Sequence, residues 1–162
     1  MPDAALPPLA DQLAESWAIS ARIDLHLLDA IDEDALDLAA PSKGRTVREV
    51  FVHLHNVRLM WIDVAGKDLM AGLEKLDKDA KPSKAALAKA LTASARAIEE
   101  LVRRAVASGG KVKNFKPHAG AFVAYLVAHE AHHRGQAALV LKMAKRPVDK
   151  KVSYGMWEWG SR

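Results

Sequence analysis

The stretch HEAHHRGQ, residues 129–136, places three histidines within five positions and closes on Arg-Gly-Gln. It lies inside a longer segment, from about His118 to Ala144, in which apolar residues recur every three or four positions. This spacing predicts an α-helix. Because residues four apart on a helix differ by only about 40° around its axis, His129 and His133 face the same neighbour. That is the spacing of two ligands on one metal ion.

The same face of this helix combines apolar and polar side chains. Phe122 and Tyr125 precede His129 along the stripe, and Gln136 follows it. The face therefore has the character of a pocket wall that is apolar at one end and polar at the other. His132 is rotated by about 60° to the other side of His129. We expect it to be a bystander.

Apolar spacing of the same kind recurs along most of the chain, and no run of alternating β-branched residues interrupts it. The sequence therefore predicts an all-α protein, a four-helix bundle. A capping box at Thr46 and Glu49 marks one helix start, and the final SYGMWEWGSR is expected to fold back onto the body. The expected helices run from about Pro8 to Ile31, from Thr46 to Gly66, from Ser83 to the Gly109-Gly110 pair, and from His118 to Ala144.

Length and composition limit what the chain can be. Its 162 residues are 50% hydrophobic and 27% charged, which is typical of a single globular domain spanning residues 1–162. No segment approaches the roughly 18 uninterrupted apolar residues of a membrane span. The N-terminal MPDAALPPLADQ is acidic and rich in proline, unlike a signal peptide. We therefore expect a cytoplasmic protein with no membrane segment.

Cysteine content and charge exclude further classes. The chain has no cysteine, which excludes disulfides, thiolate metal ligands and a thiol nucleophile of its own. Its net charge is +4, yet basic residues alternate with acidic ones, as in EKLDKDAKPSK, instead of gathering on one face. This distribution argues against nucleic acid as a partner.

The helix predicted from Thr46 offers a third metal ligand. His53 lies on an apolar stripe with Val50, Val57 and Trp61, whereas His55 is rotated by about 200° and has polar neighbours. His53 is therefore the inward candidate. Together with the two histidines of the later helix it would give three nitrogen ligands with open positions, as in catalytic zinc sites.

Structural interpretations of these histidines remain open. A single buried histidine such as His53 is more often a hydrogen-bonded core residue than a ligand, and exposed helices carry histidine pairs four apart by chance. His26 is expected near the end of the first helix and His118 at a helix start. We expect no chemistry from either.

Three stretches resemble the DinB-like, or YfiT-like, metal-binding four-helix bundles: TVREVFVHLHN at residues 46–56, HEAHHRGQ at 129–136, and GMWEWG at 155–160. The resemblance implies up-down-down-up helix order with a long crossover, and a homodimer. It also implies that the metal ligands are His53, His129 and His133. One departure concerns Asp24, which stands where relatives often carry an asparagine near the site.

The resemblance implies a function as well, because members have been regarded as metal-dependent hydrolases and some relatives are thiol S-transferases. We expect one divalent transition metal, with zinc or nickel favoured, and a small-molecule substrate. A low-molecular-weight thiol would have to arrive as a cosubstrate. Gln136 or Tyr125 could orient the substrate, and Glu130 or Asp24 could serve as a base or support a ligand. The alternative is a non-catalytic bundle that senses or sequesters a metal or ligand.

Overall fold

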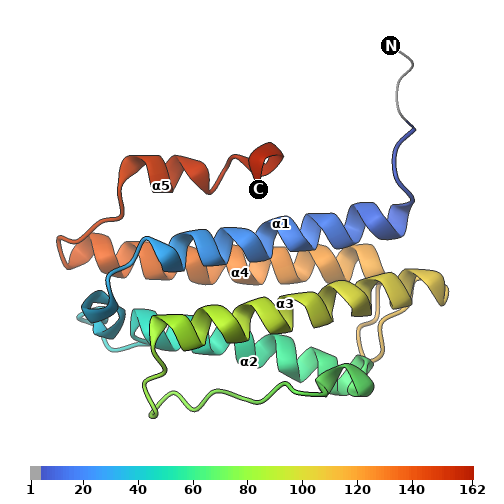
Figure 1. Ribbon diagram of the computed structural model, residues 1–162, viewed down its shortest axis with the longest axis horizontal. Coiled ribbons are helices and arrows are strands. Elements are labelled where there is room, and N and C mark those ends of the chain that lie inside the picture. The colour runs from blue at the N-terminus through green and yellow to red at the C-terminus, as the bar shows by residue number, and fades with distance from the viewer. Residues whose placement is uncertain (1–4) are drawn as a thin grey trace.

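The computed structural model describes residues 5–162, and over this range the chain is all-helical (Figure 1). Within residues 5–162, none of the helices combines the length and the apolar character that crossing a membrane requires. The all-α prediction is confirmed. The long helices are α1 (Leu9–Asp29), α2 (Val47–Ala65), α3 (Lys84–Ala107) and α4 (Ala119–Met143), and the short elements are η1 (Glu33–Asp37), η2 (Lys67–Met70), α5 (Lys150–Gly155) and η3 (Trp159–Ser161).

The long helices begin and end where local chemistry favours it. Thr46 Oγ1 accepts a hydrogen bond from Glu49 N at 3.1 Å, and Glu49 Oε2 accepts one from Thr46 N at 2.7 Å, so the predicted capping box is confirmed. His118 stands at a helix start as predicted, because its Nδ1 accepts from Ala121 N and caps α4. Beyond α3, Gly109 has a φ of 96°, a conformation that glycine adopts without strain.

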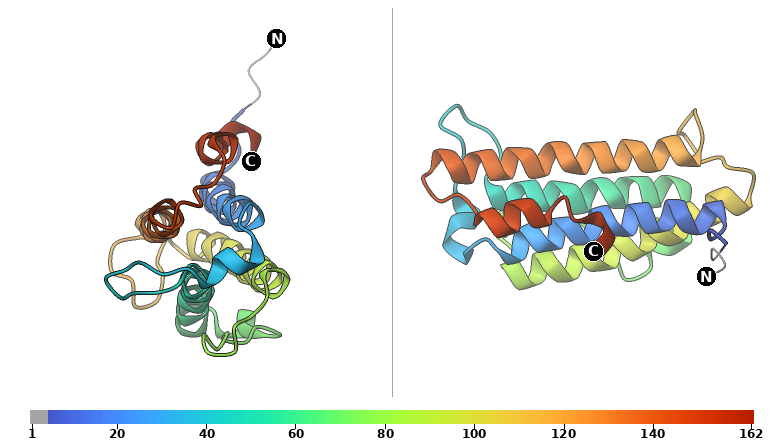
Figure 2. Two further views of the ribbon diagram at one scale, coloured as in Figure 1. Left: turned by 90° about the vertical axis from the view of Figure 1, so that its left-hand side faces the viewer. Right: turned by 90° about the horizontal axis from the view of Figure 1, so that it is seen from above.

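The four long helices pack so that α1 and α2 lie at opposite corners of the bundle, each against both α3 and α4. The end-on view in Figure 2 shows this arrangement. After η2, residues 71–83 run back along the bundle, and α2 and α3 therefore start at the same end (Figure 1). As a result α2 and α4, which carry the candidate ligands, are neighbours along their length.

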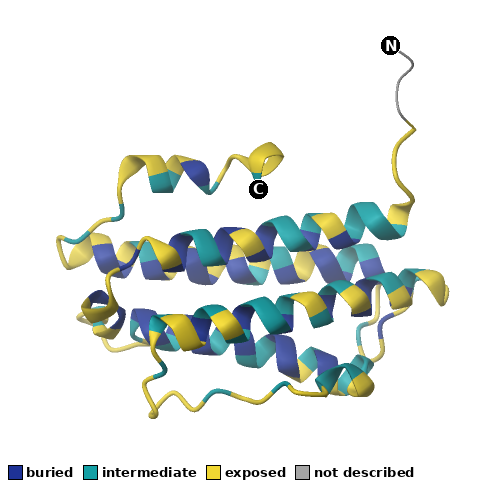
Figure 3. Cartoon of the chain, in the orientation of Figure 1, coloured by how far each residue is buried: buried dark blue, intermediate teal, exposed yellow. Residues whose placement is uncertain are grey.

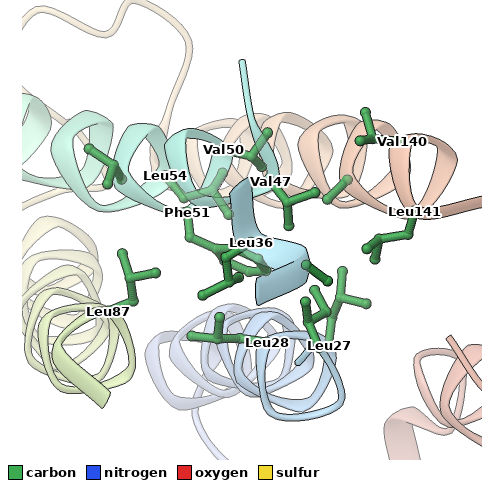
Figure 4. Close-up of a cluster of buried hydrophobic side chains, with 14 of the residues drawn as sticks. Leu27, Leu28, Leu36, Val47, Val50, Phe51, Leu54, Leu87, Val140 and Leu141 are labelled. Carbon is green, nitrogen blue, oxygen red and sulfur yellow. The ribbon is translucent and has the colours of Figure 1, made fainter. Parts of the chain in front are cut away.

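Buried residues fill the interior between these helices, as the dark blue positions in Figure 3 show. They form two apolar clusters at the two ends of the bundle. Figure 4 shows the first, in which Leu28 of α1, Leu36 of η1, Phe51 of α2 and Leu87 of α3 point toward one another. Trp17 of α1 belongs to the second cluster.

A layer of buried charged side chains lies between the two apolar clusters. Arg58 of α2, which is 1% exposed, donates to Asp24 of α1 and to Glu130 of α4, each at 2.6 Å. Arg134 of α4 donates to the other oxygen of Asp24, also at 2.6 Å. The Arg58 guanidinium also stacks over the Trp17 ring at 5.0 Å. These contacts join three of the four long helices at the middle of the bundle.

The environment of His55 corrects the sequence analysis. The sequence analysis chose only His53 as the inward residue because His55 has polar neighbours, but His55 is also buried, with Nδ1 3.1 Å from Ser94 Oγ and Nε2 2.9 Å from Glu74 O. Arg48 and Arg58 on the same side of α2 are buried as well. The physical reason is that α2 is covered on two sides, by α3 and by α4, so its polar side chains are paired inside the protein.

The C-terminal segment returns to the body of the protein, where α5 and η3 lie over α1 (Figure 2). Arg22 of α1 donates to Arg162 O at 2.8 Å, and His26 Nε2 lies 3.2 Å from Val152 O. His26 therefore has a structural role in holding the tail. Trp157 and Trp159 of this tail line a small apolar cavity against α4.

We predict that Arg58→Ala lowers the free energy of unfolding by about 3–5 kcal/mol, because it leaves the buried Glu130 without a counter-charge and leaves Asp24 paired with Arg134 alone. Arg104→Ala is the control, since Arg104 pairs with Asp68 and Glu100 on the surface and its loss should lower the free energy of unfolding far less. Urea denaturation measures both. Equal losses for the two variants would contradict the prediction.

Candidate metal centre

The three histidines chosen from sequence come together at the middle of the seam between α2 and α4. One ring nitrogen from each of His53, His129 and His133 lies within 4.8 Å of the others. His129 Nε2 and His53 Nε2 are 3.3 Å apart, and the ring centroids are separated by 4.5 to 5.2 Å. The helix spacing and the packing of α2 on α4 therefore produce one compact cluster of imidazoles.

This cluster fits a divalent transition metal. Metal–nitrogen bonds of about 2.0–2.1 Å in a tetrahedral site place two ligand nitrogens about 3.3–3.4 Å apart, and the His53 and His129 nitrogens are 3.3 Å apart. Imidazole nitrogens suit zinc, nickel, copper and iron. Calcium and magnesium prefer oxygen ligands, so the donor set does not fit them.

Gln136 orients one ligand of the cluster. Its Oε1 accepts a hydrogen bond from His133 Nδ1 at 2.8 Å, which leaves His133 Nε2 unprotonated and available to a metal. The Gln136 amide nitrogen donates in turn to His132 Nε2 at 3.0 Å. His132 thus lies outside the ligand cluster, as expected, but it holds Gln136 in place. The sequence analysis missed this link, although four-residue spacing on a helix favours it.

All three cluster histidines are held in the neutral form that a metal requires. Burial lowers the pKa of His53 to about 4, and the charge of Arg45 together with the other two histidines acts in the same direction. Burial is also the largest cause of the lowered pKa of His129 and of His133. Near neutral pH the lone pairs of the three imidazoles are therefore available for coordination.

An aromatic wall continues the seam beyond His129. The Tyr125 ring stacks on His129 with centroids 6.2 Å apart, and Trp61 and Phe115 lie 5.8 and 5.6 Å from the Tyr125 ring. Tyr125 is 37% exposed and is accessible to a ligand. Phe122 lies behind the wall and is fully buried, so its contribution is to packing. The sequence analysis treated Trp61 as core only and did not identify Phe115.

The two carboxylates proposed from sequence, Asp24 and Glu130, do point inward, but toward arginines. Both belong to the buried layer with Arg58 and Arg134. Burial raises the pKa of Glu130 well above its ordinary value, although the Arg58 charge opposes this. Their place in the layer favours a structural role, which supports the helices that carry the histidines, over that of a general base.

One residue near the cluster was not identified from sequence. Arg45 is exposed, precedes α2 and lines an open groove together with His53. Its charge contributes to the lowered pKa of all three cluster histidines. Helix periodicity could not have found it, because Arg45 lies in a loop whose position depends on the tertiary fold.

A family model described as the DinB family matches residues 1–148. The chain belongs to the DinB family. The match covers α1 to α4, and hence every segment that carries a cluster histidine, and it ends before α5. Comparisons with curated proteins and with solved structures gave no significant match. The family resemblance carried by the histidine segments is therefore confirmed for this DinB family member.

We predict that His53→Ala, His129→Ala and His133→Ala each remove most of the metal from protein reconstituted with zinc. Each substitution deletes one of three nitrogens at a site with no carboxylate in the cluster. His132→Ala is the matched control and should keep close to one metal per chain. Elemental analysis of the purified variants measures the content. Metal loss confined to the His132 variant would overturn the ligand assignment.

A second prediction concerns metal-free protein, whose stability should fall as the pH decreases from about 6.5 to about 4. An unfolded histidine titrates near 6.5, but the pKa of His53 in the fold is about 4. Between these values the unfolded state binds a proton that the folded state does not, and below them the contribution is constant. Melting temperatures of chelator-treated wild type and His53→Gln, compared across pH, test this. Parallel profiles for the two proteins would disprove it.

Proposed function

We propose that the protein is a single-domain, cytoplasmic, up-down-down-up DinB bundle that uses one divalent metal, zinc or nickel, to join a low-molecular-weight thiol to a small electrophile. The observation that carries the proposal is the convergence of three neutral imidazoles, whose candidate ligand nitrogens all lie within 4.8 Å of one another. The return of residues 71–83 along the bundle supports the helix order. Reduced thiols are available in the cytoplasm.

The ligand set favours a thiol over water as the nucleophile. His53, His129 and His133 would hold the divalent metal, whose positive charge would lower the pKa of a thiol toward neutrality. A thiol with a pKa of about 8.5 needs far less activation than water, whose pKa is much higher. Hydrolysis would also benefit from a free carboxylate base, but Asp24 and Glu130 are bound to Arg58 and Arg134.

The protein's own residues have distinct parts in this reaction. Gln136 keeps His133 in the tautomer that coordinates through Nε2. The exposed ring of Tyr125, stacked on His129, offers a surface for the apolar part of the electrophile. The thiol gives up its proton to solvent, its sulfur forms a bond to the electrophilic carbon, and the leaving group departs with the electron pair of the bond that breaks.

We also propose that the protein is a homodimer that pairs through the outward face of α4. From Ala119 to Leu141 the charged side chains of this helix are Glu130 and Arg134, and both are buried. The outward face therefore carries only small and apolar residues beside His132 and Gln136, and Leu139 on it is 56% exposed. A helix that is apolar all round is expected to be covered, and small residues permit close approach of a second copy.

We predict metal-dependent thiol transfer to an activated aryl chloride such as chlorodinitrobenzene, measured as thioether formation with chloride release. Metal-stripped protein and His129→Ala should fall to the uncatalysed rate, and His132→Ala should keep most of the activity. Hydrolysis of an activated ester without added thiol would favour a hydrolase instead. Inactivity in both assays across a panel of electrophiles would favour a metal sensor or sequestering protein.

The dimer is tested by light scattering at micromolar concentration, where wild type should have twice the 17.6 kDa mass of one chain. Leu139→Glu places a charge on the proposed interface and should yield monomers. Ala86→Glu adds the same charge to an exposed position of α3 and should leave the dimer intact. A monomeric wild type would contradict this proposal and leave the metal centre unaffected.

A further inference from the structure

An open groove of about 660 Å³ adjoins the histidine cluster. It lies between the loop before α2, the first half of α2 and the segment that returns toward α3, and His53 belongs to both the groove and the histidine cluster. Asn56 holds the far side in place, because its side chain exchanges two hydrogen bonds with the backbone of Leu76 at 2.9 and 3.0 Å. The groove is thus built on a fixed wall.

The charged residues of this groove are not equally available to a ligand. Of its acidic side chains, Glu49 accepts from Thr46 N in the capping box and Asp77 accepts from Asp79 N. Its cationic side chains are Arg45 and Lys78. Among the ion pairs formed by residues 5–162, none includes either cation. Both carboxylates of the groove thus have backbone donors, whereas neither cation has an ion-pair partner.

Arg45 is the groove cation that directly precedes the helix of His53, and the two residues line the same groove. Its charge also helps to lower the pKa of His53, of His129 and of His133. The cluster itself contributes no negative charge, because its three ligands are neutral imidazoles. A bound divalent ion and Arg45 would then form one positive region that attracts a molecule with two anionic groups.

We propose that Arg45 binds a second anionic group, such as a carboxylate, on the thiol whose sulfur occupies the metal centre. The inference rests on the proposed thiol transfer and specifies its cosubstrate class. A guanidinium presents a planar fork of donors that pairs with a carboxylate through two parallel hydrogen bonds. The groove includes His53, whereas Tyr125 stacks on His129 and does not line the groove, so thiol and electrophile would contact different residues of the site.

The test compares two thiols on cobalt-loaded protein, 3-mercaptopropionate, which carries a carboxylate, and neutral 2-mercaptoethanol. Absorption from sulfur-to-cobalt charge transfer reports binding without any turnover. Wild type should bind 3-mercaptopropionate more tightly than 2-mercaptoethanol, and this ratio of affinities should fall about tenfold or more in Arg45→Gln. Binding of 2-mercaptoethanol should be the same in both proteins. Lys43→Gln, an exposed cation of the same loop that does not line the groove, should keep the wild-type preference.

The outcomes distinguish failure of the Arg45 role from failure of the proposed thiol transfer. An unchanged preference in Arg45→Gln, or an equal loss in Lys43→Gln, would overturn the role of Arg45 and leave thiol transfer standing. Cobalt binding without sulfur-to-cobalt absorption for either thiol would overturn thiol transfer and this inference together. Failure to bind cobalt would overturn the metal centre and everything built on it.

Discussion

The rest of the site depends on the two buried ion pairs that the Arg58 guanidinium forms. It donates to a carboxylate on α1 and to another on α4, and each bond is directional, so the axial position of α2 relative to both helices is fixed. His53 lies on α2 just before Arg58, and His129 precedes Glu130 on α4. The bonds that set the register of these helices therefore also set the 3.3 Å separation of the His53 and His129 nitrogens.

The charged layer also determines the chemistry that remains for the metal centre. Asp24 and Glu130 are the carboxylates that the sequence analysis proposed for the site, and arginines pair with both of them in the interior. The imidazoles are then left as neutral donors beside an exposed cation, Arg45. A metal there would keep its full charge and would favour anionic ligands. The pairing of both carboxylates with arginines thus leaves the histidine cluster with neutral ligands only.

Helix α4 has three sides with different neighbours. One side packs Phe122, Leu126 and Ala137 into the apolar clusters, the next presents His129 and His133 to α2, and the outward side carries small and apolar residues. This exposed outward side has no charged residue between Ala119 and Leu141. The tail covers part of it, and the remaining surface is the basis for the proposed dimer.

The sequence by itself determined the features that depend on local periodicity. The four-residue spacing of His129 and His133, the stripe that carries His53 and the capping box at Thr46 are properties of single helices, so the all-α class, the helix bounds and the histidine cluster could be predicted from them. Gln136 was predicted on the same face, although its bond to His132 was not.

Only the tertiary structure decided which polar groups meet across helices. Arg58 pairs with residues 34 and 72 positions away, and Arg134 with one 110 positions away, and no helical period relates such partners. Burial of His55 depended on α3 covering a face that looks polar in sequence. The position of Arg45 depended on a loop. In each case the deciding factor was which helices became neighbours, and that follows from packing the whole chain, not from any one segment.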